Sequence, residues 1–220
     1  GWREQISALA EAGYRVWAPD QRGYNLSDKP GGAGAYKIDA LSADVVGLIE
    51  AAGRERAAVI GHDWGAAVAW WTAGRYPARV SSLGILNVPH GSVMGKHLRS
   101  SLSQLRKSWY IFFFQIPRLP ELILRRDNWR AMTRALKATS REGTFSAADL
   151  ARYREAWSQP GAITAMINWY RAAARRVPTM GHTARITVPT LVIWGAQDRF
   201  LDREMAPASA ARCEDGRLVM

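Results

Sequence analysis

The sequence predicts an α/β fold in which a parallel sheet flanked by helices is interrupted by an all-helical insertion. Helix and strand patterns alternate through the first ninety residues, helices broken by prolines follow without strand alternation, and an apolar strand pattern returns near residue 190. We therefore expect three segments: 1–90 as the first part of the sheet domain, 91–187 as the helical insertion, and 188–220 as the second part of the sheet domain.

The elements of the first segment follow from the spacing of apolar residues and from the residues that end each element. Apolar residues at helical spacing predict helices that stop at glycine or proline, and short apolar runs predict strands of a buried parallel sheet. In chain order we expect a helix over Trp2–Ala12, a strand over Tyr14–Ala18, a helix over Ile38–Ala52, a strand over Arg56–Ile60, a helix over Ala66–Tyr76 and a strand over Val80–Leu86.

The insertion and the last segment carry fewer but clear signals. Ser146, followed by Ala-Ala-Asp, predicts the capped start of a helix within the insertion. Thr190–Trp194 predicts a buried strand, followed by a loop over 195–198, a helix from about Arg203 and a further strand from Arg217. These elements return the chain to the sheet that the first segment began.

The composition is typical of a soluble globular domain, with 48% hydrophobic and 22% charged residues in a chain of 220. The single Cys213 excludes a disulfide framework within the chain and a cysteine-based zinc site. No apolar run approaches the roughly 20 residues of a membrane-spanning helix. We therefore expect no membrane span and a cytoplasmic protein.

The net charge of +11 comes from one part of the chain. Lys96 to Arg185 contains 17 Lys or Arg and 5 Asp or Glu residues, whereas the remainder contains 13 and 14. Strongly basic chains often bind nucleic acid, but no nucleic-acid recognition motif accompanies this charge. We expect no nucleic-acid partner and interpret the charge as a solvated, arginine-rich helical surface.

The strongest local motif is Gly61-His62-Asp63-Trp64-Gly65, between a predicted strand and a predicted helix. Small residues on both sides of Asp63 permit a sharp strand–turn–helix connection, the nucleophile-elbow arrangement, with Asp where Ser is common. The turn lifts the apex side chain from the sheet and places the Trp64 amide at a helix N-terminus, where it can stabilise negative charge. The alternative is an aspartate that only caps the helix.

An aspartate at the apex indicates a particular chemistry. Its pKa near about 4 leaves it ionised at neutral pH, so it can attack a saturated carbon and form an alkyl ester without a base. Water must then hydrolyse that ester, which requires a later acid, a histidine and a group that stabilises the leaving atom. Asp198, in the loop after the strand that begins at Thr190, is the candidate acid, and the alternative for it is a turn aspartate.

The chain resembles the soluble epoxide hydrolase branch of the α/β-hydrolase family over essentially its whole length. Two motifs in the insertion separate this branch from its neighbours. The motifs that carry the resemblance are Asp20–Pro30, Gly61–Gly65, Ser108–Gln115, Asn168–Arg171 and Trp194–Phe200.

The resemblance implies the insertion's role as a lid and the role of two of its tyrosines. Tyr110 and Tyr170 correspond to the family's tyrosines that donate hydrogen bonds to the epoxide oxygen. We expect the hydroxyls of these two tyrosines to lie within roughly 6 Å of each other. Trp109, Phe113 and Trp169 are then expected to line an apolar pocket. The partners implied are a small apolar epoxide and water, with no metal and no organic cofactor. Without the resemblance, the alternative for each tyrosine is a packing role in the lid.

Two parts of the family pattern have no counterpart in the sequence. The family's His-Gly-x-Pro loop, which supplies a second oxyanion amide, and its catalytic histidine after the last strand do not match any segment, and we assign that role to none of His62, His90, His97 and His182. We therefore expect a fragment with an open slot between the strands Tyr14–Ala18 and Arg56–Ile60, able at most to form the ester on Asp63.

The same residues also fit other functions. A hydrolytic haloalkane dehalogenase would use the same Asp63 attack, with Trp64 helping to bind the departing halide. An inactive remnant that serves as a binding module is the non-enzymatic alternative. An esterase is disfavoured because no serine occupies the apex of the elbow.

Overall fold

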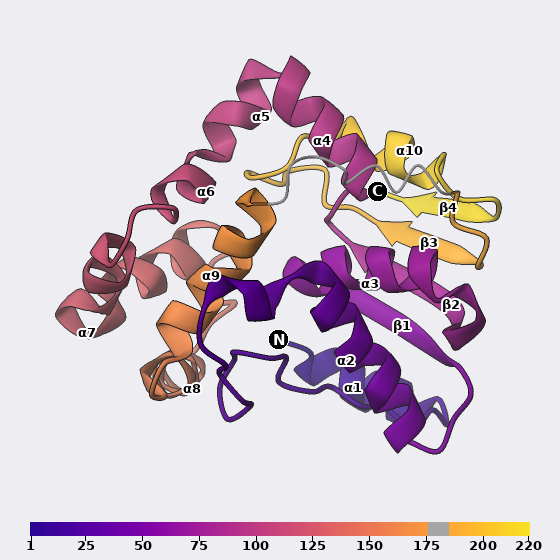
Figure 1. Ribbon diagram of the computed structural model, residues 1–220, viewed down its shortest axis with the longest axis horizontal. Helices are drawn as coiled ribbons and strands as arrows, with labels where there is room; N and C mark the ends of the chain where they lie inside the picture. Colours follow the sequence, from indigo (N-terminus) through magenta and orange to yellow (C-terminus); the bar gives the residue numbers. More distant parts are fainter. Residues whose placement is uncertain (176–184) are drawn as a thin grey trace.

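The computed structural model of the chain describes residues 1–175 and 185–220 (Figure 1). Its described strands form one parallel sheet in the order β1-β2-β3-β4. The register pairs His62 with Leu86, Leu86 with Ile193, and Ile193 with Val219, so the strands end at a common edge. Their bounds are β1 (Ala57–His62), β2 (Val80–Leu86), β3 (Thr190–Ile193) and β4 (Gly216–Val219).

Helices join the strands and cover the sheet. Helix α3 packs against β1 and β2, and α10 packs against β3 and β4. Both crossovers run in the same direction across the sheet, so right-handed connections place these two helices on one face. The bounds are α1 (Arg3–Glu11), η1 (Ala33–Tyr36), α2 (Ile38–Ala51), α3 (Trp64–Arg75), η2 (Pro77–Arg79) and α10 (Met205–Ala210).

Six described helices lie between β2 and β3, although these two strands pair directly in the sheet. Figure 1 shows α5 to α8 extending away from the sheet, while α9 returns beside η1, which it contacts. Helix α7 is kinked, with non-helical backbone angles at residues 126–129. The bounds are α4 (Gly91–Ser100), α5 (Leu102–Lys107), α6 (Trp109–Phe113), α7 (Leu119–Ala138), α8 (Ala147–Ser158) and α9 (Ala162–Ala174).

The predicted α/β class and its parallel sheet are confirmed, and most elements begin and end within two residues of their predicted bounds. The predicted strand over Tyr14–Ala18 is wrong for the described chain, because these residues carry no strand ladder, and β1 is the end strand of the described sheet. A strand is defined by its partner, and an apolar run alone does not supply one. No described helix is long and apolar enough to cross a membrane.

The core between sheet and helices fixes the edge at which the strands end. Ile85 and Val192 of the sheet and Ala66 and Met205 of the helices are fully buried in one cluster. Strand β1 and helix α3 border this cluster and pack against each other. The turn between them is therefore held on both sides. The chain therefore leaves β1 and enters α3 within a single residue, Asp63.

That turn depends on the absence of a side chain at Gly61. A Cβ atom added there would lie 2.6 Å from the backbone N and Cα of Ala66, and closer still to the carbonyl oxygen of Gly65. Backbone atoms at such a distance cannot move aside without opening the strand–helix contact. Asp63 itself has φ of 52° and ψ of −131°, a strained conformation for a residue with a side chain.

The substitution Gly61→Ala should therefore destabilise the fold by about 3 kcal/mol or more, measured by thermal or urea unfolding. Gly74→Ala in α3 is the matched control, because its added Cβ would meet only Ile186 Cδ1 at 3.5 Å, an ordinary contact. This control should leave the melting temperature unchanged or raise it, since alanine favours a helix interior over glycine. Equal melting temperatures for the two variants would contradict the close approach at Gly61.

Candidate active site

Asp63 stands at the apex of the turn, at the edge where the strands end. Its side chain makes no capping hydrogen bond to α3, so the alternative that it only caps the helix is wrong. The residue is accessible to solvent, yet the surrounding protein desolvates its carboxylate and raises its pKa above the usual range. The Asp198 charge adds to the rise, whereas His62 and the backbone N–H of Trp64 lower this pKa.

Tyr110 of α6 and Tyr170 of α9 come together in the same region. Their ring centroids are 5.8 Å apart in an edge-to-face contact, and Tyr170 makes a similar contact with Trp64 at 5.0 Å. Burial and the charge of Asp63 raise the pKa of Tyr110 to about 12 and the pKa of Tyr170 well above its usual value. Both phenols are therefore neutral hydrogen-bond donors at pH 7. The separation of their hydroxyls stays a prediction.

Asp198 follows β3 by a short loop and accepts hydrogen bonds from both sides. Its Oδ1 accepts from the backbone N–H groups of Phe200 and Leu201 at 2.8 and 2.9 Å, which is the turn role considered as its alternative. Its Oδ2 accepts from Asn87 Nδ2 at 2.6 Å. Its charge also reaches Asp63 and Tyr110, whose pKa values it raises. The same carboxylate thus shapes its loop and faces the site.

Asn87, directly after β2, was not singled out from the sequence. It has φ of 55°, and its N–H donates to Ile193 O at 3.0 Å, while its Oδ1 accepts from Gly195 N–H at 3.1 Å. Together with the bond to Asp198, these contacts fix the loop after β3 to the end of β2. A polar residue immediately after a parallel strand was the available signal, since such residues lie at the edge that carries sites.

Gln104 of α5 is a second residue that sequence reasoning missed. It is fully buried, and its Nε2 donates to Phe200 O at 2.9 Å and to Ser108 Oγ at 3.0 Å. Its Oε1 accepts from the N–H of Asp202 at 3.0 Å, and Lys107 pairs with the Asp202 carboxylate at 2.6 Å. One buried amide therefore ties the loop of Asp198 to the residue that precedes α6.

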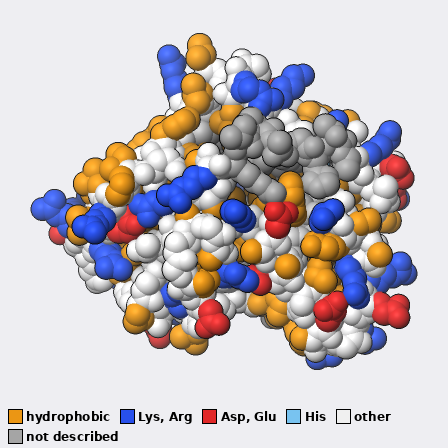
Figure 2. All heavy atoms as spheres, in the orientation of Figure 1, with side chains coloured by type: hydrophobic (Ala, Val, Ile, Leu, Met, Phe, Trp, Pro, Cys, Tyr) orange, Lys and Arg blue, Asp and Glu red, His pale blue; other side chains and the backbone are white. Residues whose placement is uncertain are grey.

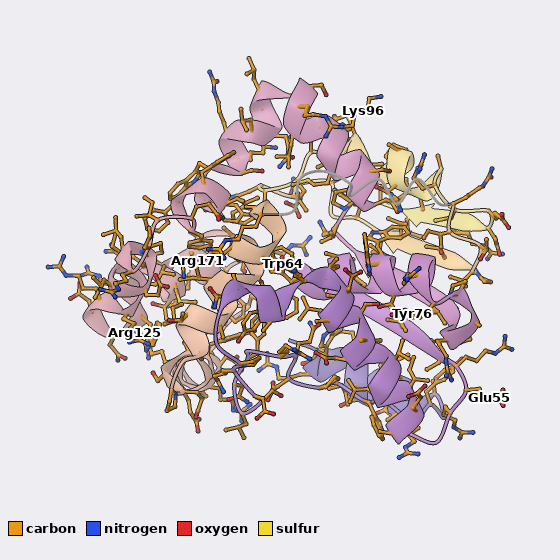
Figure 3. All side chains as sticks on the ribbon, in the orientation of Figure 1. Glu55, Trp64, Tyr76, Lys96, Arg125 and Arg171 are labelled. Carbon is orange, nitrogen blue, oxygen red and sulfur yellow. The ribbon has the colours of Figure 1, made fainter. Side chains whose placement is uncertain are left out.

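The three residues expected to line a pocket differ in their surroundings. Trp169 is buried in a core cluster and its Nε1 donates to Arg22 O at 3.0 Å, so its ring belongs to a core rather than to an open surface. Trp109 is exposed, and Phe113 is half-buried with its ring 5.9 Å from that of Trp109. Figure 3 shows Trp64 near the centre of the molecule.

Of the histidines within the described residues, His62 is the one whose charge lowers the pKa of Asp63. His62 precedes it in the chain and is exposed, His90 caps α4 by accepting from the N–H of Ser92, and His97 Nδ1 lies 3.1 Å from Val93 O within α4. His182 lies outside the described residues. Within residues 1–175 and 185–220, no three His, Cys, Asp or Glu side chains are grouped so as to hold a metal ion.

Comparison with known proteins assigns the chain to a family. Residues 1–220 match the family described as the alpha/beta hydrolase fold. The chain is 47% identical over 219 residues to the AB hydrolase superfamily protein YfhM of Bacillus subtilis, covering 100% of this chain and 76% of that protein. It is 35% identical over 234 residues to Epoxide hydrolase A of Mycobacterium tuberculosis, covering 91% and 72%.

Solved structures agree with the sequence relatives. The crystal structure of an epoxide hydrolase from Bacillus megaterium in complex with an inhibitor has a TM-score of 0.90 at 28% identity, covering 99% of this chain and 79% of that one. The chain spans 54–62% of the length of the animal epoxide hydrolases that it matches at 31–37% identity. It belongs to the α/β-hydrolase fold family, within the epoxide hydrolase family.

Proposed function

We propose that the protein acts as an epoxide hydrolase: Asp63 opens an epoxide to an alkyl ester, and hydrolysis of that ester to a vicinal diol needs a histidine base that we assign to none of the histidines of this sequence. Membership in the epoxide hydrolase family supports epoxide hydrolysis in general. One observation supports the detailed proposal: the carboxylate at the elbow is accessible, and its charge acts on two neutral tyrosines of the helical insertion whose rings are in contact. In this proposal residues 91–187 act as a lid, and the apolar rings around the tyrosines favour an apolar epoxide.

The first step forms one bond and breaks one. A carboxylate oxygen of Asp63 attacks a ring carbon of the epoxide, the bond from that carbon to the ring oxygen breaks, and the resulting alkoxide takes a proton from Tyr110 or Tyr170. An alkoxide is a poor leaving group unless it is protonated or strongly hydrogen-bonded as it forms. The raised pKa values of both tyrosines keep the proton available throughout the neutral range.

The second step adds water to the ester and returns Asp63 as a carboxylate, and the proton that this hydrolysis releases restores the tyrosinate left by the first step to a phenol. We assign to Asp198 the role of the acid that orients a histidine base, and we assign none of the four histidines of this sequence to that base. The Trp64 amide would stabilise the oxyanion that forms when water attacks the ester carbonyl, since it lies at the start of α3. Asn87 supports this step by holding Asp198 in place.

Formation of the ester can be tested directly by mass spectrometry. After incubation with styrene oxide, the intact mass of the protein should rise by the mass of one epoxide, and digestion should map the adduct to the peptide that contains Asp63. Asp63→Asn should give no adduct, whereas Asp198→Asn should still give it, because Asp198 serves only the second step. An adduct that persists in Asp63→Asn, or that maps to another peptide, would overturn the assignment.

Removal of the two phenols should slow ester formation. Tyr110→Phe combined with Tyr170→Phe removes both proton donors, and we expect a loss of about 10²-fold or more in the single-turnover rate. Tyr14→Phe is the matched control, because Tyr14 is exposed and stands outside the helical insertion. This variant should leave the single-turnover rate unchanged. Release of bromide from 1-bromobutane by the unmodified protein, together with an undiminished epoxide rate in the double variant, would favour the dehalogenase instead.

The raised pKa of Asp63 has a consequence for stability. A carboxyl whose pKa is higher in the folded than in the unfolded state contributes stability in its protonated form, and this stability is lost as the pH rises through the folded pKa. An asparagine is uncharged at every pH, so it keeps the stability that the protonated carboxyl provides. Asp63→Asn should therefore melt at a higher temperature than the unmodified protein at pH 7. The difference should shrink as the pH falls toward that pKa, and an equal or lower melting temperature at pH 7 would contradict the desolvation.

A further inference from the structure

The helical insertion exposes apolar side chains that the proposed chemistry does not use. Leu102 is 74% exposed, Trp109 is 63% exposed and Leu122 is 67% exposed. Exposed apolar residues scattered singly are ordinary, but a concentration of them in one short segment marks a contact surface. We define the apolar stripe as the residues Leu102, Trp109, Phe112, Ile116, Leu119 and Leu122, all of which are exposed.

The burial pattern sets the stripe apart from a surface adapted to water. Its members lie on three successive helices, α5, α6 and the start of α7, and in the turn that joins α6 to α7. In α5 and at the residue after it the buried positions are polar, since Gln104 and Ser108 are buried while Leu102 and Trp109 are exposed. A helix at a protein surface normally shows the reverse. The outer face of α5 and α6 is therefore suited to an apolar neighbour.

Positive charge surrounds the stripe. Residues 91–138 contain ten Lys or Arg residues, against the two acidic residues Glu121 and Asp127, and Glu121 is paired with Arg171. Figure 2 shows Lys and Arg side chains beside hydrophobic ones along the upper and left margins, where Figure 1 places α4 to α7. Lys96 and Arg125 lie at these margins in Figure 3.

We propose that this face of the insertion docks the protein on an anionic lipid membrane. The apolar stripe would enter the boundary between headgroups and acyl chains, and the flanking arginines and lysines would bind lipid phosphates. The same charge disfavours a second copy of the chain as the partner, because pairing two such faces brings like charges together. A nucleic acid would use the charge but leave the stripe in water.

Docking of this kind rests on the surface alone and does not depend on the proposed function. It involves no membrane span, and in α6 the stripe residues Trp109 and Phe112 are exposed whereas Tyr110 is half-buried. An apolar epoxide concentrates in the same interfacial layer of a membrane. The proposed surface would bring the site near that layer.

Vesicle flotation tests the proposal with the whole chain. We expect the protein to float with vesicles of equal parts phosphatidylcholine and phosphatidylglycerol, and not with phosphatidylcholine alone, and to be released by high salt. Leu102→Ser with Leu122→Ser should abolish flotation. Arg106→Ala and Arg125→Ala should each lower the partition coefficient by roughly fivefold, the effect of one basic residue near an anionic surface.

Matched controls lie outside the insertion. Leu26→Ser changes a leucine that is 76% exposed, and Arg54→Ala with Arg56→Ala removes two exposed arginines. These variants should float like the unmodified protein. The single variant Leu122→Ser serves where circular dichroism shows that the double variant has lost its helices.

Any of the following results would overturn the docking surface. The first is failure to float with the anionic vesicles, or equal flotation with neutral ones. The second is a loss of flotation in the control variants as large as in the stripe variants. The third is a dimer, detected by sedimentation without lipid, that Leu122→Ser dissociates, since that would assign the stripe to a second copy of the chain.

Discussion

The close contact between the end of β1 and the start of α3 is the constraint on which the site depends. Gly61 meets the backbone of Ala66 with no space for a Cβ atom, and this lets the chain reverse from strand to helix through Asp63 alone. Because α3 is held by the buried core of the sheet, the apex cannot relax away from the edge. The strained angles of Asp63 are thus maintained by packing at a distance from the carboxylate itself.

Polar contacts hold the other segments of the site in place relative to one another. Asn87 joins the end of β2 to the loop of Asp198, and Gln104 joins that loop to the insertion. Tyr110 then lies within ring contact of both Tyr170 and Phe200, at centroid distances of 5.8 and 6.1 Å. Three segments far apart in the sequence are therefore positioned by a small number of partly buried hydrogen bonds.

The sequence predicts those features that depend on local chemistry. Asp63 at the apex follows from the small residues around it, and Ser146 caps α8 as its position before the helix indicates. Asn87 and Gln104 could not be found in this way, because their roles depend on partners about a hundred residues away. The strand expected at Tyr14–Ala18 fails for the same reason, since a ladder requires a neighbour that the local pattern cannot provide.

The contacts of α5 also limit how the insertion can open. Moving α5 away from the loop breaks the bonds of Gln104 to Phe200 and Asp202 and the pair between Lys107 and Asp202. At about 1 kcal/mol each, these three contacts oppose that separation by about 3 kcal/mol. A path for substrate between α5 and this loop would therefore require these contacts to break in every turnover.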